Sequence, residues 1–494
     1  MKNRKYFIRK AVGLSLIAAL ALSQGCKKSF LDVQTSNTKT SQQFWQNQQD
    51  ATDAVGAMYA NLHGWTNVSF APIAIESMGS GDVDKGSSAN DASFMNDFKS
   101  FTATAGEGQI SDFWQGQYEN INYANQILGN VPNISMDANL KARYLAEAKF
   151  VRAYSYFRLL RAFGNIPLVL KAPVTPQELN PKQAPAAAVW AAIEADLNDA
   201  AAGLPATYGS ADIGHATKGA ALALHAKVAL YQNKWSDVKT YTEQVTTLGI
   251  YSLFPDFEKM FRTQNKNNSE SIFELQMILI PGNAAASNSQ YSQVQGVRGS
   301  TGGGWGFNNP SQDLINEFEA NDPRLAATVI TRGTTTPEGD AIPATGDDTY
   351  FNMKSYVPFS LYVSGFNEGC QQDKIVLRYA DVLLMNAEAN NELGNSAAAL
   401  ASLEMVRARA REGNASILPK VTTTDQGTLR TAIYHERRVE LAMEFERFFD
   451  VIRQGRAGTV FASRGFVVGK NEHWPIPQTQ IDLSGGNLVQ NKGY

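Results

Sequence analysis

The sequence contains few of the residues that form metal and redox sites. Its 494 residues include two cysteines, Cys26 and Cys370, and five histidines. The pair His435-Glu436 lacks the second histidine, four positions after the first, that completes the zinc-binding helix of many metalloproteases. A Gly-x-Ser-x-Gly nucleophile elbow is also missing. These absences exclude the commonest hydrolase and metalloenzyme motifs, and we expect no catalytic residue, no metal and no cofactor.

Long apolar runs are absent except near the N-terminus, where Ala11 to Leu22 form a short one behind five basic residues. A membrane-spanning helix needs about 20 apolar residues, so this run is too short to cross a bilayer. A basic start followed by a short apolar run is typical of a secretory signal peptide, which we place at residues 1–25. The run leads to Gly25-Cys26, and bacterial lipoprotein signals end at such a pair.

Cys26 is therefore the expected site of lipidation, with acyl chains that anchor the mature protein to a membrane. The alternative is a plain secretory signal followed by a chance cysteine, because the residue three positions before Cys26 is Ser23 and not the usual leucine. Residues 26–40 are polar and form the expected tether between the lipid and a binding domain at 41–494.

The mature chain has little positive charge. Residues 1–25 hold five of the 44 basic residues and none of the 47 acidic ones, so their removal changes the formal net charge from −3 to −8. An acidic surface binds phosphate poorly, and nucleic acid is not an expected partner. If Cys26 is acylated, Cys370 has no partner for a disulfide, and stability must come from a hydrophobic core.

Helical periodicity dominates long stretches of the mature chain. Apolar residues mark one face over 109–128 and over 139–163, and Gly164 with Pro167 ends the second helix. Two segments, 220–245 and 381–406, share a pattern of helix, tight turn and helix, with small residues inside the helices. We predict a mainly α fold of tetratricopeptide-like helix pairs, with an irregular helical bundle as the alternative. The expected units are 109–163, 186–232 or 218–248, 378–411 and a last helix at 428–454.

Between the helical blocks lie loop-rich stretches at 61–108, 249–313, 330–372 and 455–494. Long loops inside a compact domain are usually functional or disordered. These stretches contain short apolar runs, such as 272–276, which predict a minor content of small strands.

Several strings of residues, in order along the chain, are specific to one protein family. They are Phe30-Leu31-Asp32 after Cys26, Ala146 to Tyr154 with Arg161 to Leu168, Phe318 to Arg324, Leu377 to Ala389, Glu436 to Leu441 with Arg447 and Asp450, and Trp474 to Pro477 with Gln490 to Tyr494. In these strings the chain resembles the SusD/RagB family along nearly its whole mature length. The resemblance implies a helical scaffold that sits as a lid on a TonB-dependent, SusC-like outer-membrane transporter and holds an oligosaccharide, or in some members a peptide, over its mouth.

The family strings themselves are interpreted as structural. They lie on predicted helices, where the spacings Glu444–Arg447 and Asp450–Arg453 allow salt bridges on one face. They therefore indicate the fold and leave the ligand open.

The expected binding surface is aromatic and lies in two loops, near 61–108 and 281–313. Sugar rings have apolar faces that stack on exposed aromatic side chains, and their hydroxyl groups bond to Asp, Asn, Arg and Gln. Core packing is the alternative for each aromatic residue by itself. The candidate ligand-binding residues are Trp65, Asp82 and Asn90 in the first loop, and Tyr291, Arg298 and Trp305 in the second.

The segment Asp82 to Gly86 also has the alternating oxygen ligands that suit calcium, but it lacks the glycine at loop position six and the closing glutamate. An Asx-type turn is the favoured interpretation there.

Taken together, the patterns and the resemblance predict a surface-exposed lipoprotein of the outer membrane that binds a nutrient oligosaccharide and passes it to a SusC-like transporter. A peptide-capturing, RagB-like lipoprotein is a close alternative. A surface glycoside hydrolase and a helical-repeat scaffold that binds another protein are further alternatives, because the abundance of Asp and Glu decides nothing about the paired carboxylates of a glycosidase.

Overall fold

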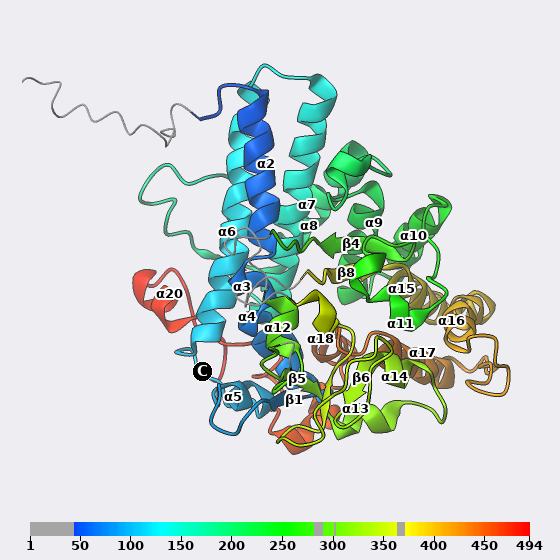
Figure 1. The fold of residues 1–494 in the computed structure, drawn as a ribbon. Coiled ribbons are helices and arrows are strands. Elements are labelled where there is room, and N and C mark those ends of the chain that lie inside the picture. Colours follow the sequence, from blue (N-terminus) through cyan, green and yellow to red (C-terminus); the bar gives the residue numbers. More distant parts are fainter. Residues whose placement is uncertain (1–43, 281–289, 301–302, 363–370) are drawn as a thin grey trace, which may run out of the picture.

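The computed structural model describes residues 44–280, 290–300, 303–362 and 371–494 (Figure 1). The predicted signal peptide, the predicted lipidation site Cys26 and the predicted tether lie outside the described residues, as does the start of the second predicted binding loop. Within the described ranges, no helix is long and apolar enough to cross a membrane.

Three long helices stand side by side in the upper left of Figure 1. They are α2 (Gln48–Leu62), α6 (Gly108–Asn130) and α7 (Ala138–Phe163). The side chain of Asp137 caps α7 by accepting a hydrogen bond from the backbone NH of Leu140 at 2.8 Å. Gly164 follows its last residue with a φ of +69°, which confirms the predicted end.

Helix hairpins form the right side of the molecule (Figure 1). The predicted turns are confirmed: Asn233 and Gly394, at equivalent places in the two similar segments, both adopt left-handed φ values of +55° and +78°. The helices are α9 (Lys218–Tyr231), α10 (Trp235–Thr247), α15 (Tyr379–Glu392), α16 (Ser396–Ala410) and α17 (Gln426–Glu440), and α8 (Ala186–Gly203) packs between α7 and α9.

The prediction of one last helix at 428–454 is wrong. The chain leaves α17 at Glu440 and begins α18 (Arg447–Arg453) after a turn. Met443 and Phe445 in that turn adopt left-handed φ values of +66° and +69°, which no helix can contain. Both side chains are buried, so packing of these two apolar residues accompanies the break.

Among the described residues, the strands form four antiparallel two-stranded ribbons. Each ribbon joins segments that are distant in sequence or closes a long loop, and β4 confirms the strand predicted at 272–276. The pairs are β1 (Val83–Gly86) with β5 (Phe307–Pro310), β2 (Ile166–Pro167) with β3 (Gln183–Ala184), β4 (Ser271–Leu275) with β8 (Lys374–Arg378), and β6 (Val329–Thr331) with β7 (Tyr350–Asn352).

Short helices connect these elements. They are α3 (Trp65–Val68), α4 (Phe70–Pro72), α5 (Met95–Lys99), α11 (Phe257–Met260), α12 (Tyr291–Gln295), α13 (Gln312–Glu317), α14 (Arg324–Thr328), α19 (Ala457–Val460) and α20 (Gln478–Leu483).

A buried network of charged side chains connects β8, α14, α16 and α17. Glu440 is fully buried and accepts hydrogen bonds from Arg378 at 2.6 Å, from Arg324 at 3.0 Å and from Arg409. Burial opposes the ionisation of Glu440, but the surrounding guanidinium groups outweigh it and hold its pKa far below the ordinary value. The family string around Glu440 thus serves the scaffold, as predicted.

One of the two predicted helical salt bridges forms and the other does not. Arg453 donates to Asp450 at 2.7 Å, as expected. Glu444 instead accepts hydrogen bonds from Arg378 and Lys354, both at 2.7 Å, and not from Arg447. The carboxylate of Glu444 therefore pairs within the buried network, although the i,i+3 spacing would have allowed it to pair with Arg447.

Candidate functional site

The two predicted binding loops lie side by side because β1 pairs with β5. Val83 lies opposite Pro310 and Gly86 opposite Phe307 in this ribbon. The first loop enters through α3 and α4, and the second through α12, which Figure 1 shows next to them. Residues more than 200 positions apart in sequence thus share one surface region.

An aromatic cluster of Trp65, Phe70, Trp305 and Phe307 forms where the loops meet. The ring of Trp305 lies 6.2 Å from that of Trp65 and 6.1 Å from that of Phe70, measured between centroids. Phe70 contacts Trp65 edge-on at 5.5 Å and Phe307 at 4.8 Å. Phe307 is buried, whereas Trp65, Phe70 and Trp305 are only partly buried. The cluster therefore rests on the core and offers two tryptophan side chains and one phenylalanine at its surface.

The glycines around Trp305 hold the loop in a defined shape. Gly303 and Gly306 have φ values of +66° and +77°, which favour glycine. A Cβ atom on Gly304 would lie 2.2 Å from the carbonyl carbon of Gly296, so only glycine fits at that close approach. The NH of Trp305 donates to the carbonyl of Gln293 at 2.8 Å. The local backbone at 303–306 is thus fixed by contacts.

A polar rim borders the cluster. Arg298 is about half exposed and donates to the hydroxyl of Ser87 at 2.6 Å and to the carboxylate of Asp91 at 2.9 Å. Lys85 supports the same turn, since its ammonium group donates to three backbone carbonyls at 2.7–2.8 Å. Asn90 is exposed at the tip of the turn. Hydrogen-bond donors and acceptors for sugar hydroxyls therefore lie in the turn that follows β1 and in the segment that leads into β5.

Two of the six candidate residues are buried and do not face outward. Asp82 is 2% exposed, and its carboxylate accepts a hydrogen bond from Arg438 at 2.8 Å. Tyr291 is 6% exposed, and the ammonium group of Lys374 lies 5.9 Å from its ring centre. Both residues hold the scaffold beneath the loops, and we remove them from the candidate contact set.

The segment around Asp82 is a strand and not the expected turn. Val83–Gly86 forms β1, in which successive side chains point to opposite faces. Asp82 is neutralised by Arg438 and Asp84 by Lys99. These pairings explain the alternating carboxylates without calcium.

Sequence reasoning missed Ser87, Asp91 and Tyr362 near the site. The hydroxyl of Tyr362 accepts a hydrogen bond from the amide of Gln293 at 3.1 Å, and it lies 2.6 Å from the place where a Cβ atom of Gly303 would be. Tyr362 comes from the stretch 330–372, which carried no pattern that connected it with the other two loops.

One group of potential metal ligands occurs in the described ranges, at Glu319, His435 and Glu436. Arg407 donates to Glu319 at 2.8 Å and to Glu436 at 2.7 Å, and Glu436 also binds Arg324 at 2.6 Å. The two carboxylates are therefore already neutralised by arginines, and this arrangement does not favour a cation.

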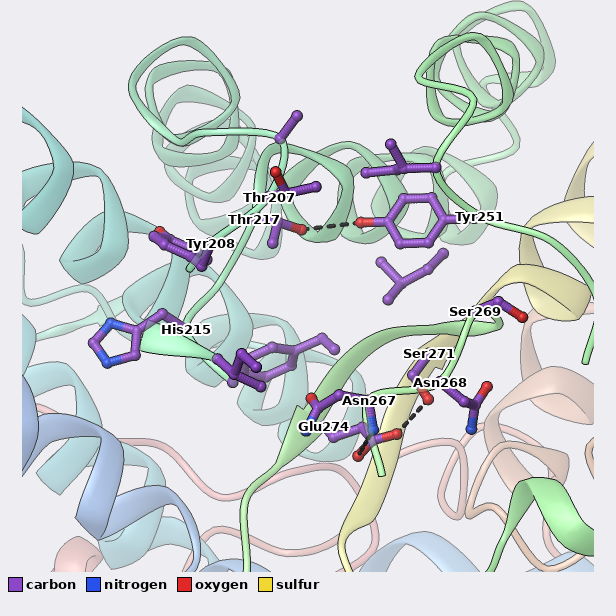
Figure 2. A pocket seen from close by; sticks show the side chains of 16 residues that line it. Thr207, Tyr208, His215, Thr217, Tyr251, Asn267, Asn268, Ser269, Ser271 and Glu274 are labelled. Carbon is purple, nitrogen blue, oxygen red and sulfur yellow. Dashed lines mark hydrogen bonds between the residues drawn. The ribbon is translucent and has the colours of Figure 1, made fainter. Parts of the chain in front are cut away.

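A separate polar pocket lies between the 206–217 loop and β4 (Figure 2). Its hydroxyl and carboxyl groups bond to one another: Thr217 to Tyr251 at 3.1 Å, and Ser271 to Glu274. Burial and the neighbouring Asp373 raise the pKa of Glu274 to about 8. The pocket contains no exposed tryptophan, so the aromatic cluster remains the better candidate for a sugar-binding surface.

Comparison with known proteins gives consistent matches. Residues 29–230 match the family model described as "Starch-binding associating with outer membrane", and residues 269–494 match the model of the SusD family. "SusD-like protein P2" of Formosa agariphila is 28% identical over 419 residues, which cover 80% of this chain and 82% of that protein. A SusD-like protein of Bacteroides ovatus is 28% identical over 89% of this chain and 82% of its own length.

Solved structures extend the match to the fold. A laminarin binding SusD-like protein aligns with 91% of this chain and 100% of its own, at 30% identity and a TM-score of 0.79. A SusD-like protein from Bacteroides fragilis aligns with 91% of this chain and 98% of its own, at 25% identity and a TM-score of 0.76. Two family models in tandem, and a structure that aligns over its whole length, lead to one conclusion: the chain belongs to the SusD/RagB family.

Proposed function

We propose that this protein binds a nutrient oligosaccharide at the aromatic cluster and does no chemistry on it. The proposal rests on the contact between Trp65 and Trp305, which are 240 positions apart in the sequence. The half-exposed ion pair of Arg298 and Asp91 lies beside these two side chains. Partly buried rings anchored on the core lose little conformational entropy when a ligand stacks on them.

The chemistry of the site matches a sugar ring. Such a ring presents apolar CH faces to Trp65 and Trp305 and hydroxyl groups at its edge. The guanidinium of Arg298 and the amide of the exposed Asn90 can donate to those hydroxyls, and Asp91 can accept from them. Within the similar proteins, the 30% identical structure is laminarin binding, which makes laminarin oligosaccharides the first probe.

The proposal includes a place for the protein in the cell. Lipidation at Cys26 would anchor it to the outer membrane, exposed at the surface, where it would deliver the glycan to a SusC-like TonB-dependent transporter. The family description "Starch-binding associating with outer membrane" supports this assignment. Co-purification of the transporter with the lipidated protein from membranes tests it, and recovery of the protein alone under mild detergent would contradict it.

The binding test uses the soluble protein, residues 27–494, titrated calorimetrically with laminarin oligosaccharides and a panel of other glycans and peptides. We expect saturable binding of at least one glycan, lost in the double variant Trp65→Ala/Trp305→Ala. Trp190→Ala is the control, because Trp190 is also partly buried but packs on Phe157 at 6.2 Å, away from the cluster. Binding of peptides alone would favour the RagB-like alternative.

The same samples test the hydrolase alternative. Prolonged incubation with a glycan that binds should release no reducing ends. Release that is lost with a single carboxylate variant would identify an enzyme and overturn the non-catalytic part of the proposal.

A further inference from the structure

A second groove, with a volume of about 1010 Å³, lies apart from the aromatic cluster. It is formed by the outer face of α17, the 419–428 segment, the turn after α13, and the region of α18 and α19. Its volume is similar to the upper end of the range for ligand-binding pockets in other proteins, about 300–1000 Å³. Its lining is rich in charged and polar side chains, among them Arg407, Arg438, Arg447, Arg456, Thr428 and Thr431.

Two of the arginines in this groove are neutralised by carboxylates. Arg438 donates to Asp82 at 2.8 Å, to Asp313 at 3.0 Å and to Glu317. Arg407 is held by Glu319 and Glu436, as described above. These side chains belong to the scaffold.

Arg447 and Arg456 differ from the other two. Among the described residues, neither has a carboxylate oxygen within the 4.0 Å of a salt bridge, and the Nε atom of Arg447 is buried without a hydrogen-bond partner. Arg456 donates to the side chain of Gln454 at 3.2 Å and lies over the ring of Tyr434 at 5.5 Å. The groove therefore contains two guanidinium groups with unused donors.

The surroundings of Arg447 increase this imbalance. Burial lowers the pKa of Arg447. Among its neighbours Asp82 acts most strongly and raises this pKa, Arg438 and Arg456 lower it, and Asp450 raises it, so that the net shift is downward. The nearby Asp450 is occupied by Arg437 and Arg453, both at 2.7 Å. Like charges held together in a partly desolvated groove are unfavourable unless an anion joins them.

We propose that this groove binds an oxyanion, the carboxylate or sulfate group of an acidic sugar, at Arg447 and Arg456. Two guanidinium groups bind such planar or tetrahedral oxyanions with paired, charge-assisted hydrogen bonds. The hydroxyls of Thr428 and Thr431 line the same groove, and because they donate to Asp425 and to the carbonyl of Gly427 they offer acceptors to the sugar. This site is independent of the neutral stacking surface at Trp65 and Trp305.

The test follows the melting temperature and calorimetric titration of residues 27–494 with sodium glucuronate, sodium sulfate and glucose, at ionic strength matched with NaCl. We expect saturable binding of glucuronate, sulfate or both, and none of glucose alone. Glucuronate without sulfate identifies a carboxylate sugar, and sulfate without glucuronate identifies a sulfate ester. Effects equal to those of NaCl for both anions overturn the proposal.

Variants locate the site. Arg447→Gln and Arg456→Gln should each weaken anion binding by about tenfold or more, the size expected for one charge-assisted contact. Arg430→Gln is the matched control, since Arg430 lies on α17, which forms one side of the groove, carries the same charge and pairs with Glu392 outside the groove. Unchanged binding in both groove variants, or an equal loss in the control, contradicts the assignment.

Stability separates a binding role from a structural one. Because Arg447 lacks a paired carboxylate, Arg447→Gln should leave the melting temperature of the free protein equal or raise it. A clear fall together with unchanged anion binding would make Arg447 structural and refute the proposal. Arg456→Gln gives a second reading if the first variant does not fold. The variant Trp65→Ala/Trp305→Ala should keep anion binding, which distinguishes this site from the proposed glycan surface.

Discussion

Replacing Trp305 by alanine tests the aromatic cluster most directly. Complete removal of a buried tryptophan side chain costs about 3–5 kcal/mol of stability. Trp305 is only partly buried, and its ring centroids lie 6.2 Å and 6.1 Å from Trp65 and Phe70, in the outer part of the range for aromatic pairs. We therefore expect a stability loss of about 1–2 kcal/mol, well below that of a core residue.

Trp305→Ala should also weaken ligand binding, and this effect is the more informative of the two. A stacking residue at the centre of an interface contributes about 1–3 kcal/mol to binding, which is roughly tenfold to more than a hundredfold in affinity. The backbone of the loop should persist in Trp305→Ala, because the NH of residue 305 donates to Gln293 and does not depend on the side chain.

Calorimetric titration and a melting curve on the same preparation separate the two effects. The control Trp190→Ala should show a comparable change in melting temperature and no change in affinity. Unchanged affinity in Trp305→Ala would remove Trp305 from the site. A drop in stability of the full 3–5 kcal/mol would show that its ring is a core element, and the reasoning from partial burial would be refuted.

Three further predictions concern other parts of the chain. Cys26→Ser should release the protein from the membrane fraction or leave its precursor unprocessed, and unchanged fractionation, in cells without the transporter, would contradict lipidation. Glu440→Gln should destabilise the fold by about 3–5 kcal/mol in denaturant unfolding, because Arg324, Arg378 and Arg409 each lose one of their buried carboxylates; a change below about 1 kcal/mol would contradict this role. Since burial and Asp373 raise the pKa of Glu274 from 4.5 to about 8, its stabilising effect is complete below its ordinary pKa and is lost as pH rises through about 8. Glu274→Gln should therefore flatten the fall in melting temperature between about pH 5 and pH 8, and an unaltered pH profile would show that Glu274 is not the group responsible.

The helices could be predicted from the sequence because their signals are local. The apolar face over 139–163 and the glycine at 164 predict α7 almost to its ends. The two equivalent turns also have a local signal, since Asn233 in one and Gly394 in the other adopt the left-handed conformation. The prediction at 428–454 was wrong because helical periodicity continues across 441–446, where buried Met443 and Phe445 turn the chain. Tertiary packing overrode the local pattern there.

The candidate site was predictable only in part, because a sequence indicates which residue types are present and not which of them face solvent. Aromatic and polar residues identified both loops, and the pairing of β1 with β5 brings Trp65 and Trp305 together. Composition could not distinguish them from Tyr291, which is buried, or connect either loop with Tyr362.

The arginines show the same limit in electrostatic terms. The spacing of three residues suggested that Glu444 pairs with Arg447, but Glu444 binds Arg378 and Lys354, which lie 66 and 90 residues earlier in the chain. The whole network decides which cation pairs with a buried carboxylate, because a buried cation without a partner costs several kcal/mol. Arg378 and Lys354 are nearly fully buried, whereas Arg447 lines an open groove. The side chain that loses this competition is therefore the one that solvent, or an anionic ligand, can still reach.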